Sequence, residues 1–194
     1  MKIHARTERL ILRDWTSDDL DDYAAIVADP EVMAHIGDGE PRARSYAVDF
    51  LATVTEQQAT RGWTRFAVEH AKSGQLMGFC GVDDKIGRLD FGWRYGKEFW
   101  GAGYGYEAAA AALWVCQNVF HLTHITSQSY PENVGSIRII EKMGMVKIGE
   151  GAAFGRPLAI YGFKNEWPEG VRRVVKPTPV VRKRPRPFNW SRIP

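Results

Sequence analysis

The sequence is poor in the features that mark secreted, membrane-spanning and metal-binding proteins. It has two cysteines in 194 residues, Cys80 and Cys116, which stand far apart inside apolar segments. This placement predicts buried reduced thiols and no disulfide framework. The five histidines are scattered without the spacing of metal ligands, so we expect no bound metal. No apolar run approaches the ~20 residues of a membrane span, and the N-terminus lacks a signal-peptide core, so we expect a cytoplasmic protein without a membrane partner.

Positive charge is concentrated at the C-terminal end of the chain. The net charge is +3, but residues 168–194 carry eight Lys or Arg residues against one Glu, or +7, which leaves −4 for residues 1–167. Prolines such as Pro177 and Pro185 disfavour helix and central strand there. We expect one domain at 1–167 and a basic, proline-rich tail at 168–194. The tail is a solvated extension, a contact for nucleic acid or the ribosome, or a segment that docks on the domain or a second copy; monomer and homodimer both remain open.

Hydrophobic periodicity predicts a mixed sheet with flanking helices in the remaining chain. We expect Ser17 to cap the first helix and Gly144 to end the last one in the left-handed conformation. The expected strands are 10–12, which comes first, 64–69, 76–82, 88–94, 124–129, 145–148 and 158–164, and the expected helices are 17–28, 43–59, 108–119 and 134–143, with a short turn at 30–33.

The most informative segment is 99–108, which reads FWGAGYGYEA between a predicted strand and an alanine-rich helix. The first turn of a helix leaves about four N–H groups without intrahelical partners and carries roughly half a positive charge. Glycines allow the backbone to curl around an anion. The spacing fits neither the dinucleotide pattern G-x-G-x-x-G nor the Gly-Lys-Ser/Thr end of a triphosphatase loop. The segment predicts a pyrophosphate site, or else a tight turn that lets the helix approach a sheet closely.

A second motif, YPENVGSIRIIEKMGM at 130–145, closes a strand and opens a helix. Together with WGAGYG at 100–105, TERLILR at 7–13 and MGFCG at 77–81, it resembles the GNAT superfamily of acetyl-CoA-dependent N-acetyltransferases. The closer likeness is to the branch of the ribosomal-protein alanine acetyltransferases, and it covers residues 6–167. The resemblance implies a single α/β (α+β) domain whose mixed, mostly antiparallel sheet has a V-shaped splay between two central strands. It also implies acetyl-CoA as co-substrate.

The resemblance assigns residues to each part of the co-substrate. Asn133, which also reads as a helix cap, would reach the pantetheine arm. Arg138 would meet a phosphate of CoA or else face solvent. Glu107 would point away from the pyrophosphate and be structural. The pantetheine arm would also pair with the backbone of Phe91, Gly92 and Trp93, and the pyrophosphate would be surrounded by Trp100, Gly101, Ala102, Gly103, Tyr104, Gly105 and Tyr106.

Ser136 is the candidate catalytic residue. Many members of the family protonate the departing thiolate with a tyrosine at the position of Ile140, and in the alanine-acetylating branch a serine at position 136 is thought to serve instead. By this analogy Ser136 donates the proton, directly or through water. No cysteine falls in the inferred cleft, which favours direct attack of the amine in a ternary complex over an acetyl-enzyme.

The acceptor is expected to be a primary amine, either a protein N-terminus or a small molecule. An α-amine, with a pKa of about 7.8, is often neutral near pH 7, whereas a lysine side chain, at about 10.4, rarely is. In the loop 35–42, Asp38 and Glu40 would attract a cationic amine, and Trp63 would supply an apolar wall. The general base stays unassigned, because an ion pair explains each candidate more simply: Glu69, Asp83, Asp84, Asp90 and, beside them, His70.

Two functions of other classes remain open. Because the usual tyrosine is absent and the base is unassigned, the chain could bind CoA without turnover. Alternatively, the basic tail could make it a ribosome or RNA adaptor, with RNA binding that weakens as salt rises.

Overall fold

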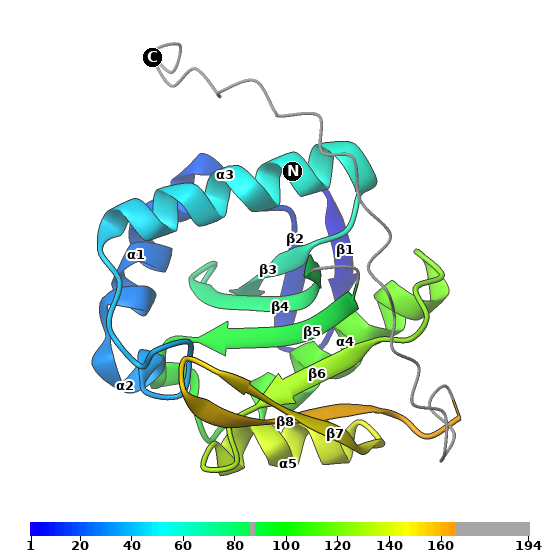
Figure 1. Cartoon of the computed structure of the whole chain (residues 1–194). Coiled ribbons are helices and arrows are strands. Elements are labelled where there is room, and N and C mark those ends of the chain that lie inside the picture. Colours follow the sequence, from blue (N-terminus) through cyan, green and yellow to red (C-terminus); the bar gives the residue numbers. More distant parts are fainter. Residues whose placement is uncertain (86–87, 166–194) are drawn as a thin grey trace.

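A computed structural model describes residues 1–85 and 88–165 (Figure 1). These residues form one eight-stranded sheet in which β5 and β6 are parallel and all other neighbours antiparallel, so the predicted mixed, mostly antiparallel sheet is confirmed. The tail at 168–194 lies outside the described residues. In spatial order the strands are β1 (Ile3–Arg6), β2 (Leu10–Arg13), β3 (Arg65–His70), β4 (Leu76–Lys85), β5 (Arg88–Tyr95), β6 (Thr126–Ser129), β8 (Arg156–Phe163) and β7 (Met145–Ala153).

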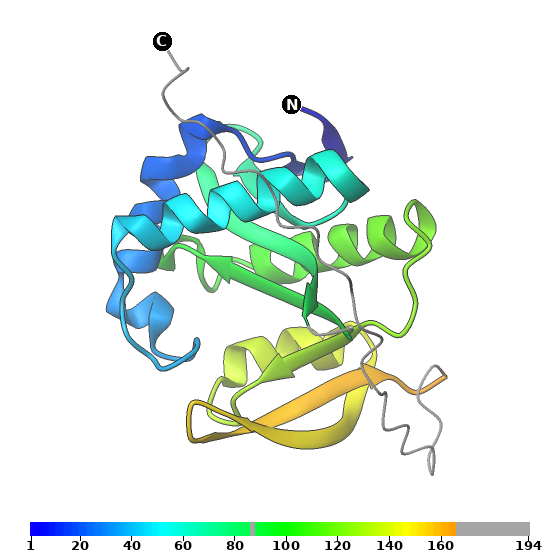
Figure 2. The same cartoon turned by 45° about the horizontal axis from the view of Figure 1, so that its top comes forward.

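Helices cover both faces of the sheet (Figures 1 and 2). Phe66 and Val68 of β3 pack in the same cluster as α4, whereas Ala67 packs with α1 and α3, as the alternation of side chains along a strand requires. The helix α5 packs on β6 and β7 and touches α4. The helices are α1 (Leu20–Ala28), α2 (Pro30–Met33), α3 (Arg44–Arg61), α4 (Tyr104–Asn118) and α5 (Val134–Lys142), with short 3-10 turns η1 (Ser17–Asp19) and η2 (Lys97–Phe99).

The helix expected at 108–119 begins four residues earlier, at Tyr104, so the end of the glycine segment forms its first turn. Three other expectations about local structure are also wrong. The strand at Leu10 is not the first, because the short segment β1 precedes it and pairs with β2. The helical segment that leads into α1 is capped by Thr16, not Ser17: the Thr16 N–H donates to Asp19 Oδ2 at 2.8 Å, and Ser17 already begins η1. Finally, β7 continues to Ala153 because it forms a long hairpin with β8. In each of these three cases tertiary pairing or a neighbouring cap outweighed the local pattern.

Both expected features of α5 are confirmed. Asn133 caps it, since Asn133 Oδ1 accepts a hydrogen bond from the Ser136 N–H at 3.1 Å. Gly144 follows its last turn with φ +85°, in the left-handed conformation. Because the cap uses the backbone of Ser136, it leaves the serine hydroxyl free to act elsewhere.

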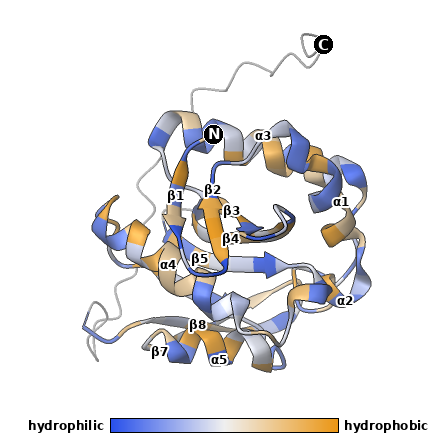
Figure 3. Cartoon of the chain, turned by 180° about the vertical axis from the view of Figure 1, so that it is seen from behind, coloured by the Kyte–Doolittle hydropathy of each residue, from blue (hydrophilic) through white to orange (hydrophobic). Residues whose placement is uncertain are grey.

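The core lies on both faces of the sheet. All four residues of β2, which is largely hydrophobic in Figure 3, are buried. Cys80 and Cys116 are buried free thiols, as expected; burial raises the pKa of Cys80 and raises that of Cys116 to about 12. Within residues 1–85 and 88–165, no helix combines the length and the apolar character needed to cross a bilayer.

Candidate active site

The strands β5 and β6 meet at one end only. Their parallel ladder has a single pair, Asp90 with Thr126. Two hydroxyls tie the strands together at this point: Thr126 Oγ1 donates to the Leu89 carbonyl at 2.9 Å, and Ser127 Oγ donates to the Phe91 carbonyl at 2.8 Å. Farther along, the two strands diverge (Figure 1). This divergence is the V-shaped splay that the resemblance implies.

A cavity of about 580 Å³ lies where the strands separate. The wall is formed by the end of β5, by the glycine turn at 101–105, by the start of α5, and by residues in and after α2. The cavity therefore joins the two motifs of the sequence, although they are about thirty residues apart in the chain. Of the predicted cofactor-binding residues, it is lined by Trp93, Trp100, Gly101, Gly103, Gly105, Tyr106, Asn133 and Ser136.

The other predicted cofactor residues lie outside the wall of this cavity. Phe91 is buried, and its carbonyl already accepts the Ser127 hydroxyl. The ring of Tyr104 lies 4.4 Å from the guanidinium carbon of Arg9. Their roles at the cofactor stay predictions, as do those of the remaining residues outside the wall, Gly92, Ala102 and Arg138.

The glycine turn opens the helix α4 toward the cavity. Gly101 and Gly103 have φ values of +76° and +83°, where side chains are strained, and Gly103 is the N-cap of α4. A Cβ on Gly105 would stand 2.9 Å from Ile139 Cδ1, so this glycine allows α4 and α5 to approach. The first turn of α4 therefore starts at the cavity wall, where Gly103, Gly105 and Tyr106 lie, and the first N–H groups of a helix lack intrahelical partners, as an anion site requires.

Glu107 and Arg9 hold this turn against the loop between β1 and β2. Glu107 accepts hydrogen bonds from Thr7 Oγ1 at 2.5 Å and from Arg9 Nε at 2.7 Å, and Arg9 Nη1 donates to the Ala102 carbonyl at 3.0 Å. Burial alone would raise the pKa of Glu107, but the hydrogen bonds from Thr7 and Arg9 outweigh it and lower the pKa. Glu107 is therefore engaged in a structural contact, as expected.

We expect Glu107→Gln to loosen the turn. The loss of charge-assisted bonds should cost about 1 kcal/mol of unfolding free energy and weaken acetyl-CoA binding roughly 5-fold. The pKa of Glu107 is lowered in the folded state. Its contribution to the free energy of unfolding is therefore complete above the ordinary glutamate pKa of about 4.5 and is lost as the pH falls through the lowered pKa. Urea unfolding of both proteins at about pH 7 and about pH 3 measures this. Glu56→Gln, the same substitution at an exposed glutamate, is the control. A difference in stability between the wild type and Glu107→Gln that persists at about pH 3 would contradict the ion pair.

Ser136 lines the cavity from the first turn of α5, and Ile140 does not. Ile140 is fully buried and packs with Met145, Ala159 and Tyr161. The position of the usual tyrosine is therefore part of the core in this chain. Of these two positions, only that of Ser136 places a hydroxyl at the cavity.

The predicted acceptor-side residues do not line the cavity. Asp38 forms an ion pair with Arg42 at 2.5 Å. The ring of Trp63 lies under Arg61, with 3.6 Å between the guanidinium carbon and the ring centroid, just before β3. Glu40 is exposed on the same loop as Asp38. Their substrate role stays a prediction that this geometry does not support.

Four charged or ionisable residues that sequence reasoning did not select line the cavity: Glu31, His35, Arg94 and Glu132. Glu132 pairs with Arg156 at 2.5 Å, and this hydrogen bond, with a smaller effect of His35, lowers the pKa of Glu132. Glu31 pairs with Lys97. The sequence does contain one signal for Glu132. It directly precedes Asn133, which the resemblance assigns to the co-substrate.

An ion pair was expected for each of the four carboxylates considered as bases, and three of them form one within the described residues. Glu69 lies 2.6 Å from Arg13 Nε, and Asp90 lies 2.9 Å from Arg65 Nη2. Asp83 lies 3.5 Å from Arg61 Nη2. These contacts give each of the three carboxylates a structural role.

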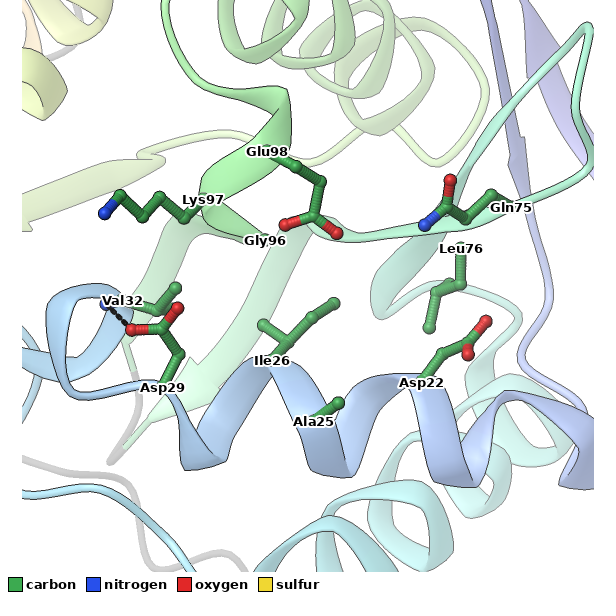
Figure 4. A pocket seen from close by; sticks show the side chains of 10 residues that line it. All are labelled: Asp22, Ala25, Ile26, Asp29, Val32, Gln75, Leu76, Gly96, Lys97 and Glu98. Carbon is green, nitrogen blue, oxygen red and sulfur yellow. Dashed lines mark hydrogen bonds between the residues drawn. The ribbon is translucent and has the colours of Figure 1, made fainter.

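A second cavity, of about 190 Å³, lies between α1 and the segment 96–98. Figure 4 shows the side chains of Asp22, Gln75 and Glu98 pointing into the same space. Asp29, also in its wall, already caps α2, with Oδ1 2.8 Å from the Glu31 nitrogen. Within the described ranges, no group of three or more His, Cys, Asp or Glu residues is arranged to hold a metal ion. We assign no ligand to this cavity.

Known proteins match both the sequence and the fold. The p20 protein of Bacillus licheniformis, an uncharacterized N-acetyltransferase, is 27% identical over 164 residues, which cover 81% of this chain and 92% of p20. The ribosomal-protein-S5-alanine acetyltransferase of Vibrio fischeri shares the fold with a TM-score of 0.68 at 16% identity, over 86% of this chain and 99% of that one. RimL, a ribosomal L7/L12 alpha-N-protein acetyltransferase solved in complex with coenzyme A, has a TM-score of 0.67 at 11% identity, over 82% and 96%.

The family model described as the acetyltransferase (GNAT) domain matches residues 9–146. This range contains the glycine turn, the splayed strands and the Asn133–Ser136 motif. Since the match spans more than half of the chain, the protein belongs to the GNAT family of acetyltransferases, whose acetyl donor is acetyl-CoA.

Proposed function

We propose that the protein transfers the acetyl group of acetyl-CoA to a primary amine, by direct attack of the amine in a ternary complex. The observation that carries the proposal is the single cavity that joins the glycine turn at the N-terminus of α4 to Ser136 between the splayed strands. The amine is that of a protein N-terminus or of a small molecule.

The proposed arrangement divides the co-substrate between two elements. The pyrophosphate would lie at the first turn of α4, where free N–H groups and the helix dipole favour an anion. The pantetheine arm would lie in the splay, along Trp93 of β5 and Asn133 at the start of α5. The thioester would then stand near Ser136, and a backbone N–H of β5 would stabilise the carbonyl oxygen as it gains charge.

Direct attack fits the state of the two cysteines. An acetyl-enzyme needs a reactive thiolate at the site. Cys80 and Cys116 are buried in the core with raised pKa values, and neither lines the cavity. The amine itself would therefore attack the thioester. The nitrogen–carbon bond forms, the carbon–sulfur bond breaks, and the sulfur takes a proton from Ser136 or from a water that Ser136 holds. The nitrogen loses one proton as the amide forms, and this proton, carried through water, replaces the one that was given to the sulfur.

Ser136→Ala should lower kcat roughly 100-fold, which is the smallest effect usually seen when a positioned general acid is removed. The affinity for acetyl-CoA should change little. The helix cap survives, because it uses the Ser136 nitrogen. Steady-state kinetics and calorimetry separate the two effects. An acetyl thioester of an acidic aromatic thiol should restore the rate, because its thiolate leaves without a proton; an equal defect with this donor argues for a structural role.

The experiment that tests the proposal follows release of the CoA thiol from acetyl-CoA, with and without a panel of amines. We expect release that depends on the amine, together with the acetylated product by mass spectrometry. Tight acetyl-CoA binding without acetylation of any amine would instead indicate a CoA-binding module without turnover.

A further inference from the structure

Arg94 on β5 is a buried cation in the wall of the large cavity. Its exposed fraction is 6%, and it follows the cavity residue Trp93 directly. Arg94 Nη1 donates to Tyr23 Oη at 2.9 Å, but the buried Nε has no hydrogen-bond partner. Its other close neighbours are aromatic faces, with the guanidinium carbon 5.5 Å from the ring centroid of Phe79 and 5.7 Å from that of Tyr46.

Other guanidinium groups that point into this domain are neutralised by carboxylates. Arg13 pairs with Asp19 at 2.7 Å and with Glu69 at 2.6 Å. Arg65 pairs with Asp90. Arg94 is the exception among the three, since no carboxylate of residues 1–85 or 88–165 forms an ion pair with it. A buried charge without a counter-charge is costly, so its presence at a cavity wall calls for a ligand.

The groups around Arg94 do not supply that counter-charge. Burial raises the pKa of Tyr23, so its hydroxyl accepts the hydrogen bond as a neutral phenol. The two carboxylates in the same cavity wall are occupied elsewhere, Glu31 by Lys97 and Glu132 by Arg156. Arg94, which lines the cavity, therefore carries a positive charge that no carboxylate of the described cavity wall neutralises.

We infer that Arg94 binds a carboxylate of the acceptor, so that the acceptor is an amine that also carries a carboxylate. This inference rests on the proposed function. Arg94 and Ser136 line one cavity, so a carboxylate on Arg94 and an amine at the thioester can belong to one small molecule. A guanidinium is suited to this task, because its fork of N–H donors matches the two oxygens of a carboxylate. The carboxylate is the α-carboxylate of a free amino acid or an acidic side chain beside an α-amine.

The test compares kcat/KM for acceptors that differ only in the carboxylate. Free amino acids are paired with their α-amides, and glutamate α-amide is paired with glutamine α-amide, which separates the two sources of the carboxylate. The wild type should prefer the carboxylate member of one pair roughly 10- to 100-fold, as expected for a hydrogen bond between charged groups. Arg94→Gln should abolish that preference. Arg44→Gln, which removes an exposed guanidinium paired with Asp21, should keep it.

Each outcome decides the inference. If the wild type shows no preference for the carboxylate in either series of acceptors, the inference is overturned. This result does not depend on whether a variant folds. A preference that survives in Arg94→Gln, with acetyl-CoA binding retained by calorimetry, also overturns it. Acetylation confined to amines without a carboxylate overturns the inference but leaves the proposed function intact, whereas acetyl-CoA binding with no amine acetylated at all overturns both.

Discussion

Gly101→Asp should weaken acetyl-CoA binding roughly 100-fold, or about 2.8 kcal/mol. The new carboxylate would stand beside the site proposed for the pyrophosphate, and two like charges about 4 Å apart repel by up to about 4 kcal/mol at an effective dielectric constant near 20. Gly101 lines the cavity, and a Cβ there would meet no atom within 4 Å, so the folded domain has room for the side chain. Calorimetric titration with acetyl-CoA measures the loss.

Gly74 provides a matched control for this variant. Its φ is +74°, against +76° for Gly101, and a Cβ at either position would meet no atom within 4 Å. Gly74→Asp therefore introduces the same charge at the same backbone conformation, in a turn between β3 and β4. If both variants lose the same stability but only Gly101→Asp loses affinity for acetyl-CoA, the pyrophosphate lies at the glycine turn. Unchanged binding by a folded Gly101→Asp would place the pyrophosphate elsewhere.

Arg13→Met should destabilise the domain by about 3–5 kcal/mol, the usual result of removing one partner of a buried ion pair. Arg13 reaches two carboxylates, and its hydrogen bond with Asp19 raises the pKa of Arg13 in spite of burial. The exposed fractions of the Arg13 and Asp19 side chains are 6% and 5%, so the substitution leaves a charge in the core without compensation. Urea unfolding at neutral pH measures the change.

An exposed ion pair offers the contrast. Arg44 and Asp21 have exposed side-chain fractions of 58% and 83%, so Arg44→Ala should cost less than about 1 kcal/mol. Adding Asp19→Asn to Arg13→Met should recover part of the stability, because it removes the stranded charge. A loss with Arg13→Met as small as that with Arg44→Ala would mean that the buried network does not stabilise the fold.

Local features of the site could be predicted because their cause is local. The glycine turn follows from backbone conformation at Gly101 and Gly103, and the cap at Asn133 follows from a side chain that bonds the N–H three residues later. Apart from β1, the order of strands and helices follows from hydrophobic periodicity over neighbouring residues. The resemblance then supplied the splay, which periodicity alone does not predict.

The acceptor side could not be predicted in the same way. The sequence shows that Asp38 is acidic and lies in a loop, but not that Arg42 takes its charge. It shows that Trp63 is aromatic, but not that its ring lies under Arg61 outside the cavity wall. The direction of a loop side chain depends on partners that only the folded chain brings near.

The family and the order of helices and strands after β1 follow from residue type and short spacing along the chain, whereas the role of the glycine turn in binding an anion stays a prediction. The tertiary structure alone decided which charges are neutralised. It brought Glu107 to Arg9 across 98 residues, and it left Arg94 buried at the cavity without a carboxylate among the described residues. The energy of an ion pair depends on the distance between the two charges in space, whereas a sequence shows only how many residues separate them along the chain.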